Sequence, residues 1–341
     1  MTEQKKRGWV GPLLRWLIPL TISGVAIWLV LREIEFSQFV NNLTLIGWEA
    51  ILLASGVYFV SFFFRAFCWY ILLRRKVSFK DAFFTMGAGY LLNNIFPLRL
   101  GEIGRALLLD DPDGPSALEV LSSIVVERIF DVFLAALFVL AMLPRIIGGT
   151  FDQRLIVLAL VLAVGGLMVL FLAARFHLNV LGWFNRWGTR SEFIKLRVTP
   201  KVIQLLEGLS VLNHPGAFAL AFGSLVISWF LAFGQNFIVF RSLHPAPSFW
   251  WMIFVLSAAS FGAALPSAPA GLGVYEGVMV AAFALLGVEA ELAFTHALVI
   301  HAMAFVYANL MGLIGLRLRG QALVSLYRRA IRRAPEIQTS E

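Results

Sequence analysis

The sequence has few charged residues and only one cysteine for its length. Charged residues make up 14% of its 341 residues, against about a quarter in an average soluble protein. The single cysteine, Cys68, excludes a disulfide framework. The sequence also lacks a P-loop, a nucleophile-elbow motif and the Cys/His spacing of a metal site. These absences predict no catalytic residues, no cofactor and no metal.

Long apolar stretches dominate the sequence instead. Hydrophobic residues make up 60% of the chain, and the mean hydropathy is +0.82. A soluble core cannot explain several separate apolar stretches that each approach the roughly 20 residues needed to cross a bilayer as a helix. These stretches lie at about 13–31, 50–73, 118–143, 154–174, 216–240 and 292–316. We therefore predict an all-α polytopic membrane protein with about six spanning helices.

The net charge of +8 is concentrated in the connecting segments and the ends of the chain. Basic connections are typical of the cytoplasmic side of a membrane, so nucleic acid is not needed as a partner to explain them. We predict a basic cytoplasmic N-terminus at 1–12, a single transmembrane domain at 13–319 and a basic cytoplasmic tail at 320–341. Within the domain, 175–215 is predicted to be an amphipathic cytoplasmic connector. The expected location is the plasma membrane of a bacterium or archaeon.

Two apolar regions are interrupted and do not fit ordinary spans. Region 81–109 is split at Pro97, and region 249–288 is split around 266–273, so each piece is short for a crossing. Counting the crossings between the basic cytoplasmic connections then requires each region to enter and leave on one side, the cytoplasmic side for 81–109 and the outer side for 249–288. We predict two re-entrant helical hairpins of opposite orientation. This arrangement is typical of an inverted repeat.

The first break carries an unusual density of polar residues. Non-helical backbone at membrane depth must be buried in protein or line a wet cavity, and a helix start beside arginine favours an anion such as phosphate. A structural alternative is that Glu102 pairs with Arg99 or Arg105 to hold the hairpin tip. The candidate headgroup-binding residues here are Asn93, Asn94, Arg99, Gly101, Glu102 and Arg105.

The apolar stretch at 118–143 contains Glu127, Arg128 and Asp131 on one side of a helix. Arg65 in the second stretch lies at a similar depth of roughly 12–13 Å from the cytoplasmic end. We therefore predict that Arg65 pairs with Glu127 or Asp131. The sequence leaves two roles open for this polar network, a structural lock between helices and a direct contact with substrate.

The second break is built of small residues, with Gly271 and Gly273 permitting strained backbone or close helix packing. Glu276 is the ionisable group nearest to it, and it could receive a proton or a cationic headgroup or cap a helix. We add these three residues to the candidate headgroup-binding site. Polar residues of the last stretch, His296, His301 and Asn309, are expected to form hydrogen bonds between helices.

Three ordered motifs lie in the polar segments described above. They are Asn93-Asn94-x-x-Pro97-x-Arg99-x-Gly101-Glu102-x-x-Arg105, Val-Glu127-Arg128-Ile-Phe-Asp131 and Pro-Ala-Gly271-Leu-Gly273-Val-Tyr-Glu276-Gly277. The motifs resemble those of the lysylphosphatidylglycerol synthase transmembrane region, a flippase-like integral membrane domain, and the resemblance covers roughly residues 10–320. The resemblance implies the translocation part only, because we expect this chain to lack the separate cytosolic catalytic domain of the bifunctional synthases.

Sequence and resemblance together predict a flippase-like lipid translocase that is not driven by ATP. Its expected partners are membrane lipids, either an anionic phospholipid or a polyprenyl-phosphate-linked substrate. The alternative is a membrane-embedded enzyme, or an accessory subunit, of a pathway that modifies lipids or polyprenyl-linked glycans. In that case a separate synthase or glycosyltransferase would be a partner.

Overall fold

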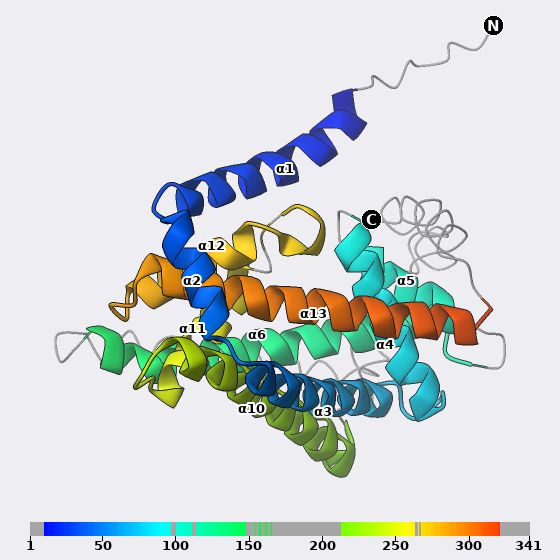
Figure 1. Ribbon diagram of the computed structural model, residues 1–341. Helices are drawn as coiled ribbons and strands as arrows, with labels where there is room; N and C mark the ends of the chain where they lie inside the picture. Colours follow the sequence, from blue (N-terminus) through cyan, green and yellow to red (C-terminus); the bar gives the residue numbers. More distant parts are fainter. Residues whose placement is uncertain are drawn as a thin grey trace, which may run out of the picture.

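The structure, a computed structural model, describes residues 10–96, 100–110, 114–147, 213–262, 265 and 267–320, together with the isolated positions 154, 157, 161 and 165. Within these residues every regular element is helical, which confirms the predicted all-α class (Figure 1). The predicted span at 154–174, the connector at 175–215 and the tail at 320–341 fall largely outside the described residues. So does most of the predicted N-terminal segment, 1–12.

The first half of the described chain contains six helices and the second half four, with a short 3-10 turn between two of them. The first six are α1 (Val10–Leu31), α2 (Phe36–Leu45), α3 (Trp48–Leu72), α4 (Phe79–Ile95), α5 (Leu100–Leu109) and α6 (Ala117–Ile147). The remainder are α10 (Pro215–Leu243), α11 (Phe249–Gly262), the turn η3 (Pro269–Gly271), α12 (Val274–Ala284) and α13 (Ala290–Leu318). Helix α2 was not predicted, because its 10 residues are too few to span a bilayer.

Among the described residues, α3, α10 and α13 are long and apolar enough to cross a membrane. Helix α6 is longer, at 31 residues, but Glu127, Arg128 and Asp131 interrupt its apolar sequence. The shorter apolar helices include Pro19–Leu31 of α1 and Phe249–Gly262 of α11. Helices of this length and composition place the chain among membrane proteins. The total number of spans stays a prediction.

Helices α4 and α5 form a tight antiparallel hairpin around the first break. A Cβ added to Gly101 would clash with the carbonyl oxygen of Gly89, so the two backbones pack in direct contact. At the open end of the hairpin, Arg319 after α13 contacts both Asp81 of α4 and the carbonyl of Leu108 in α5. The hairpin therefore enters and leaves at one end of the molecule, beside the end of α13.

Helices α11 and α12 form the second hairpin, which opens at the opposite end. Phe240, near the end of α10, packs against Trp251 of α11, Phe283 of α12 and His296 of α13. The end of α10, the start of α11, the end of α12 and the start of α13 thus meet in one cluster. The two hairpins have opposite orientations, as the parity of the loop charges requires. Whether their tips lie inside a bilayer stays a prediction.

The helix packing follows one pattern in both halves. Helix α3 packs along α10, α4 packs on α13, and α11 packs on α6 (Figure 1). If α3, α4, α5 and α6 are exchanged with α10, α11, α12 and α13 in that order, the same set of packed pairs results. This is the packing that an inverted repeat requires. Ser61 of α3 and Ser228 of α10 form a hydrogen bond at 3.0 Å, where the two halves meet. The predicted repeat itself stays a prediction.

Candidate functional site

Glu127 lies at the centre of a buried ionic network in the middle of α6. Its side chain is fully buried, and both carboxylate oxygens accept hydrogen bonds from arginines. Arg105 of α5 donates to Oε2 at 2.8 Å, while Arg128 and Arg65 donate to Oε1 at 2.8 and 3.3 Å. A single side chain thereby connects α3, α5 and α6.

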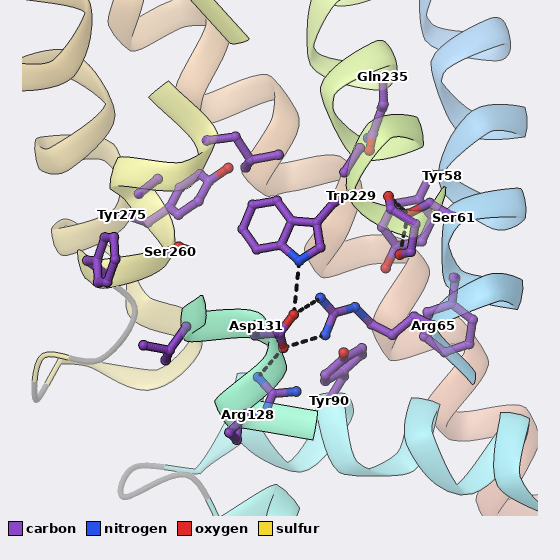
Figure 2. A pocket seen from close by; sticks show the side chains of 17 residues that line it. Tyr58, Ser61, Arg65, Tyr90, Arg128, Asp131, Trp229, Gln235, Ser260 and Tyr275 are labelled. Carbon is purple, nitrogen blue, oxygen red and sulfur yellow. Dashed lines mark hydrogen bonds and ion pairs between the residues drawn. The ribbon is translucent and has the colours of Figure 1, made fainter. Parts of the chain in front are cut away.

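Asp131, one turn further along α6, forms the second part of the network. Arg65 binds it in a bidentate manner, with N–O distances of 2.7 and 2.8 Å. Trp229 of α10 donates from Nε1 to the same carboxylate at 3.1 Å. Figure 2 shows Arg65, Arg128 and Trp229 converging on Asp131. The predicted pairing of Arg65 is confirmed, and Arg65 contacts both acids rather than one.

Arg128 is the most accessible cation of the network. The network contains three arginines and two carboxylates, so one positive charge is left over. The side chain of Arg128 is 41% exposed, against 19% for Arg65 and 3% for Arg105. Arg128 forms ion pairs with Glu127 at 2.8 Å and with Asp131 at 3.5 Å. The excess charge is therefore available to an anion at Arg128.

Arg105 is held inside the protein, behind Glu127. Its guanidinium lies 3.7 Å from the ring centroid of Trp69, a distance that gives a cation–π contact. Trp69 is fixed in turn by a hydrogen bond from Nε1 to Ser123 at 3.0 Å. The sequence predicts Arg105 as a headgroup contact, whereas in this structure it does not line the cavity described next. Arg105 is connected to the cavity residues Arg65 and Arg128 through their shared partner Glu127.

A cavity of about 390 Å³ lies beside the exposed side of this network. Helices α3, α4 and α6 line it from the first half of the chain, and α10, α11 and α12 line it from the second (Figure 2). Arg65, Arg128 and Asp131 form its charged wall. Hydroxyl, amide and indole groups supply further polar contacts, from Tyr58, Ser61, Tyr90, Ser228, Trp229, Gln235, Ser260 and Tyr275.

The predicted residues of the first break have structural partners instead of a place in the cavity. Asn93 accepts a hydrogen bond from the backbone N–H of Gly101 at 2.7 Å, and so caps α5 across the break. Asn94 donates to Asn309 of α13 at 3.1 Å. Glu102 pairs with neither the buried Arg105 nor any other described cation, and its Oε2 has no hydrogen-bond partner in the described part of the chain. Arg99 lies outside the described residues.

The second break is stabilised by Glu276 and by backbone conformations that favour glycine. Gly271 and Gly273 have φ angles of 81° and 83°, and Ala270 has a φ of 62°. Glu276 accepts a hydrogen bond from the N–H of Gly273 at 2.7 Å and contacts His301 of α13. The helix-capping role considered for Glu276 is thereby confirmed.

The polar residues of α13 form hydrogen bonds between helices, as expected. His296 contacts Asn236 of α10 at 3.1 Å, and His301 contacts Glu276 of α12. Asn309 accepts the hydrogen bond from Asn94 of α4. These residues hold α13 against α10, α12 and α4.

Sequence reasoning missed Trp229, Gln235 and Tyr275 as cavity residues. Trp229 lies in a mostly apolar part of α10, where no local pattern distinguishes it from a core residue, whereas the polar pair Gln235–Asn236 in the same helix could have drawn attention to Gln235. Tyr275 could have been found, because it directly precedes Glu276 in the motif of the second break. Their common role depends on the meeting of two halves, which no local spacing encodes.

Comparison with known proteins gives one result for almost the whole chain. The family model described as "Lysylphosphatidylglycerol synthase TM region" matches residues 16–312. No curated protein and no solved structure shows a significant match. The matched range contains both hairpins, the ionic network and every residue that lines the cavity. The chain therefore belongs to the family of the lysylphosphatidylglycerol synthase transmembrane region.

Proposed function

We propose that this protein moves a lipid with a phosphate-bearing headgroup between the two leaflets of the membrane. The observation that carries the proposal is the excess positive charge at Arg128, on the wall of a cavity shared by both halves of the chain. Arginine suits phosphate because its planar N–H groups can donate two parallel hydrogen bonds. The headgroup would bind at Arg128 and the nearby hydroxyl groups.

The size and the apolar rim of the cavity support a lipid as the cargo. A volume of about 390 Å³ is at the lower end of the usual range for small-molecule sites, so it suits a headgroup rather than a whole lipid. Val132 of α6 and Phe261 of α11 line the cavity and are also exposed on the outer surface, at 56% and 40%. We infer that the cavity opens sideways between α6 and α11, which leaves the lipid chains in the bilayer.

The packing of the two halves supports alternating access. Two features of inverted-repeat transporters are present, namely hairpins of opposite orientation and the packing of equivalent helices of each half against the other half. In such transporters the site between the repeats opens to each side in turn. We propose such a repeat here, in a plasma membrane and with both termini cytoplasmic. The sequence contains no ATPase motif, so we propose downhill flow or coupling to a gradient. The cargo lipid is an anionic phospholipid or a polyprenyl-phosphate-linked lipid.

Reconstitution of the full chain into liposomes tests the proposal. Translocation of fluorescent phosphatidylglycerol, phosphatidylcholine and a polyprenyl-phosphate-linked sugar is measured by dithionite quenching or enzymatic accessibility. Arg128→Gln should slow translocation of the preferred lipid at least tenfold. A hydrogen bond to a charged group contributes about 1.5–3 kcal/mol, and about 1.4 kcal/mol corresponds to a factor of ten.

The matched control is Arg241→Gln, which removes an exposed arginine at the end of α10, away from the cavity. This variant should translocate lipid at the wild-type rate. Translocation that is unaffected by Arg128→Gln would overturn the proposed headgroup site. Conversion of a lipid-linked substrate into a new product, without translocation, would show a membrane-embedded enzyme instead.

A further inference from the structure

His301 lies between two oxygen atoms at the second break. Its Nδ1 is 2.5 Å from Oε1 of Glu276, and its Nε2 is 3.1 Å from the carbonyl oxygen of Ala270. The other carboxylate oxygen of Glu276 accepts the N–H of Gly273 at 2.7 Å. The imidazole therefore joins α13 both to the start of α12 and to the η3 turn.

The partners of His301 determine how many protons this site holds. A carbonyl oxygen can only accept, so Nε2 must carry a hydrogen and donate to Ala270. Glu276 Oε1 and His301 Nδ1 then need one further hydrogen between them, on whichever of the two atoms it resides. Either an imidazolium faces a carboxylate or a neutral imidazole faces a carboxylic acid, and both descriptions contain the same extra proton.

We propose that Glu276 and His301 form a proton-binding site that holds the second break closed, and that loss of its proton releases the break. Without the proton, a lone pair on Nδ1 faces a negatively charged oxygen at hydrogen-bond distance, and the contact becomes repulsive. The proton passes to water, and the pair becomes a neutral imidazole and a carboxylate. A bound proton thus stabilises the closed conformation.

In the described part of the chain, the elements around the second break carry few ionisable residues besides Glu276 and His301. Helix α11, the η3 turn and residues 19–31 of α1 contain no ionisable residue. On α12 the other ionisable group is Tyr275, and on α13 the nearest are His296 and Tyr307. Helix α4, which also packs against η3, carries Asn93 and Asn94 at that end, whereas its Lys80, Asp81 and Tyr90 lie further back along the helix.

The site is mechanically connected to the cavity. The ring of His301 packs against Tyr275, with centroids 4.9 Å apart, and Tyr275 lines the cavity. On the other side, Ser23 of α1 accepts the N–H of Ala268 at 2.8 Å, so the turn is held between α1 and α13. Release of His301 would free one of these two attachments and the tyrosine beside it. If the proposed lipid transport is correct, this step would couple proton binding to access to the cavity.

Conservative replacement of the carboxylate distinguishes a proton site from a structural contact. In Glu276→Gln the introduced amide oxygen can still accept from Gly273, and its NH₂ can donate to Nδ1 of a neutral His301. Every hydrogen bond of the closed break is then satisfied without a titrating proton. We expect Glu276→Gln to keep the break closed as the pH rises, because its contact needs only a neutral His301, whereas Glu276→Ala should leave the break open at every pH.

Thiol labelling reports the opening directly and needs no transport activity. In the full-length Cys68→Ala background, Val274→Cys places a buried thiol at the first residue of α12, and Leu285→Cys places an exposed one just beyond its end. Alkylation of any thiol speeds up with pH because more thiolate forms, and dividing the rate at residue 274 by the rate at residue 285 removes this common effect. With Glu276 present, this ratio should rise with pH, by up to about tenfold per pH unit for loss of a single proton, until the break is open. With Glu276→Gln it should stay low and flat.

A ratio that is independent of pH when Glu276 is present would overturn the proposal. So would an unchanged pH dependence in Glu276→Gln, even if Glu276→Ala fails to fold. Lipid translocation is measured on the same samples, and its pH dependence should also be abolished by Glu276→Gln. A protein without translocation but with a pH-dependent labelling ratio would refute the proposed function and leave the proton site standing.

Discussion

Glu127→Gln tests whether the ionic network stabilises the fold as its geometry implies. The replacement preserves the volume of the side chain but removes the carboxylate that three arginines contact at 2.8, 2.8 and 3.3 Å. It also places an amide NH₂ against guanidinium groups that can only donate hydrogen bonds. Arg105, which is 3% exposed, loses its only ion-pair partner among the described residues.

The expected cost is about 3–5 kcal/mol, which is typical when one partner of a buried ion pair is removed. A single contact at about 4 Å contributes about 4 kcal/mol at an effective dielectric constant of about 20, before desolvation is subtracted. The matched control is Glu119→Gln, at the start of the same helix. Its partner Lys76 is 37% exposed, and the amide oxygen introduced by Glu119→Gln can still accept the N–H of Ser116, so this change should cost at most about 1 kcal/mol.

The measurement is the fraction of detergent-purified protein that remains monodisperse on size-exclusion chromatography after heating. Glu127→Gln should lose its monodisperse peak at a clearly lower temperature than the wild type and the control. Adding Arg105→Gln should recover part of the loss, because the unpaired buried charge is removed with it. Equal midpoints for Glu127→Gln and Glu119→Gln would refute the reasoning, since the network would then contribute no more than a surface pair.

Two further predictions concern the helix contacts around the site. Gly101→Ala should destabilise the first hairpin by about 1–3 kcal/mol or more in the same heating assay, because its Cβ would meet the backbone of Gly89. Gly56→Ala, where a Cβ has open space, should not destabilise the protein. Equal effects of the two replacements would contradict the close packing. Arg65→Lys should lower both stability and lipid translocation, because lysine cannot reproduce the bidentate contact with Asp131. Wild-type behaviour in both measurements would show that a positive charge at this position is sufficient without the bidentate contact.

Much of the architecture could be predicted because a bilayer imposes it locally. Stretch length sufficed for the all-α class, and matched depths sufficed for the pairing of Arg65 with the acids of α6. The re-entrant placement of the two hairpins stays a prediction. The roles of Arg105 and Asn93 could not be predicted in the same way. The charge of Arg105 suggested a phosphate contact, yet it lies against Trp69 and Glu127, and Asn93 caps a helix across the break.

The sequence by itself determined that this chain is a helical membrane protein with a broken helix in each half. Those features follow from apolar length, positive charge and proline, each of which acts over a few neighbouring residues. Only the tertiary structure decided which charge is left exposed and where the cavity lies. Glu127 neutralises Arg105 and leaves Arg128 accessible, and Trp229 and Tyr275 complete the cavity from the other half. Such contacts depend on how helices distant in sequence pack together, and local spacing carries no record of that packing.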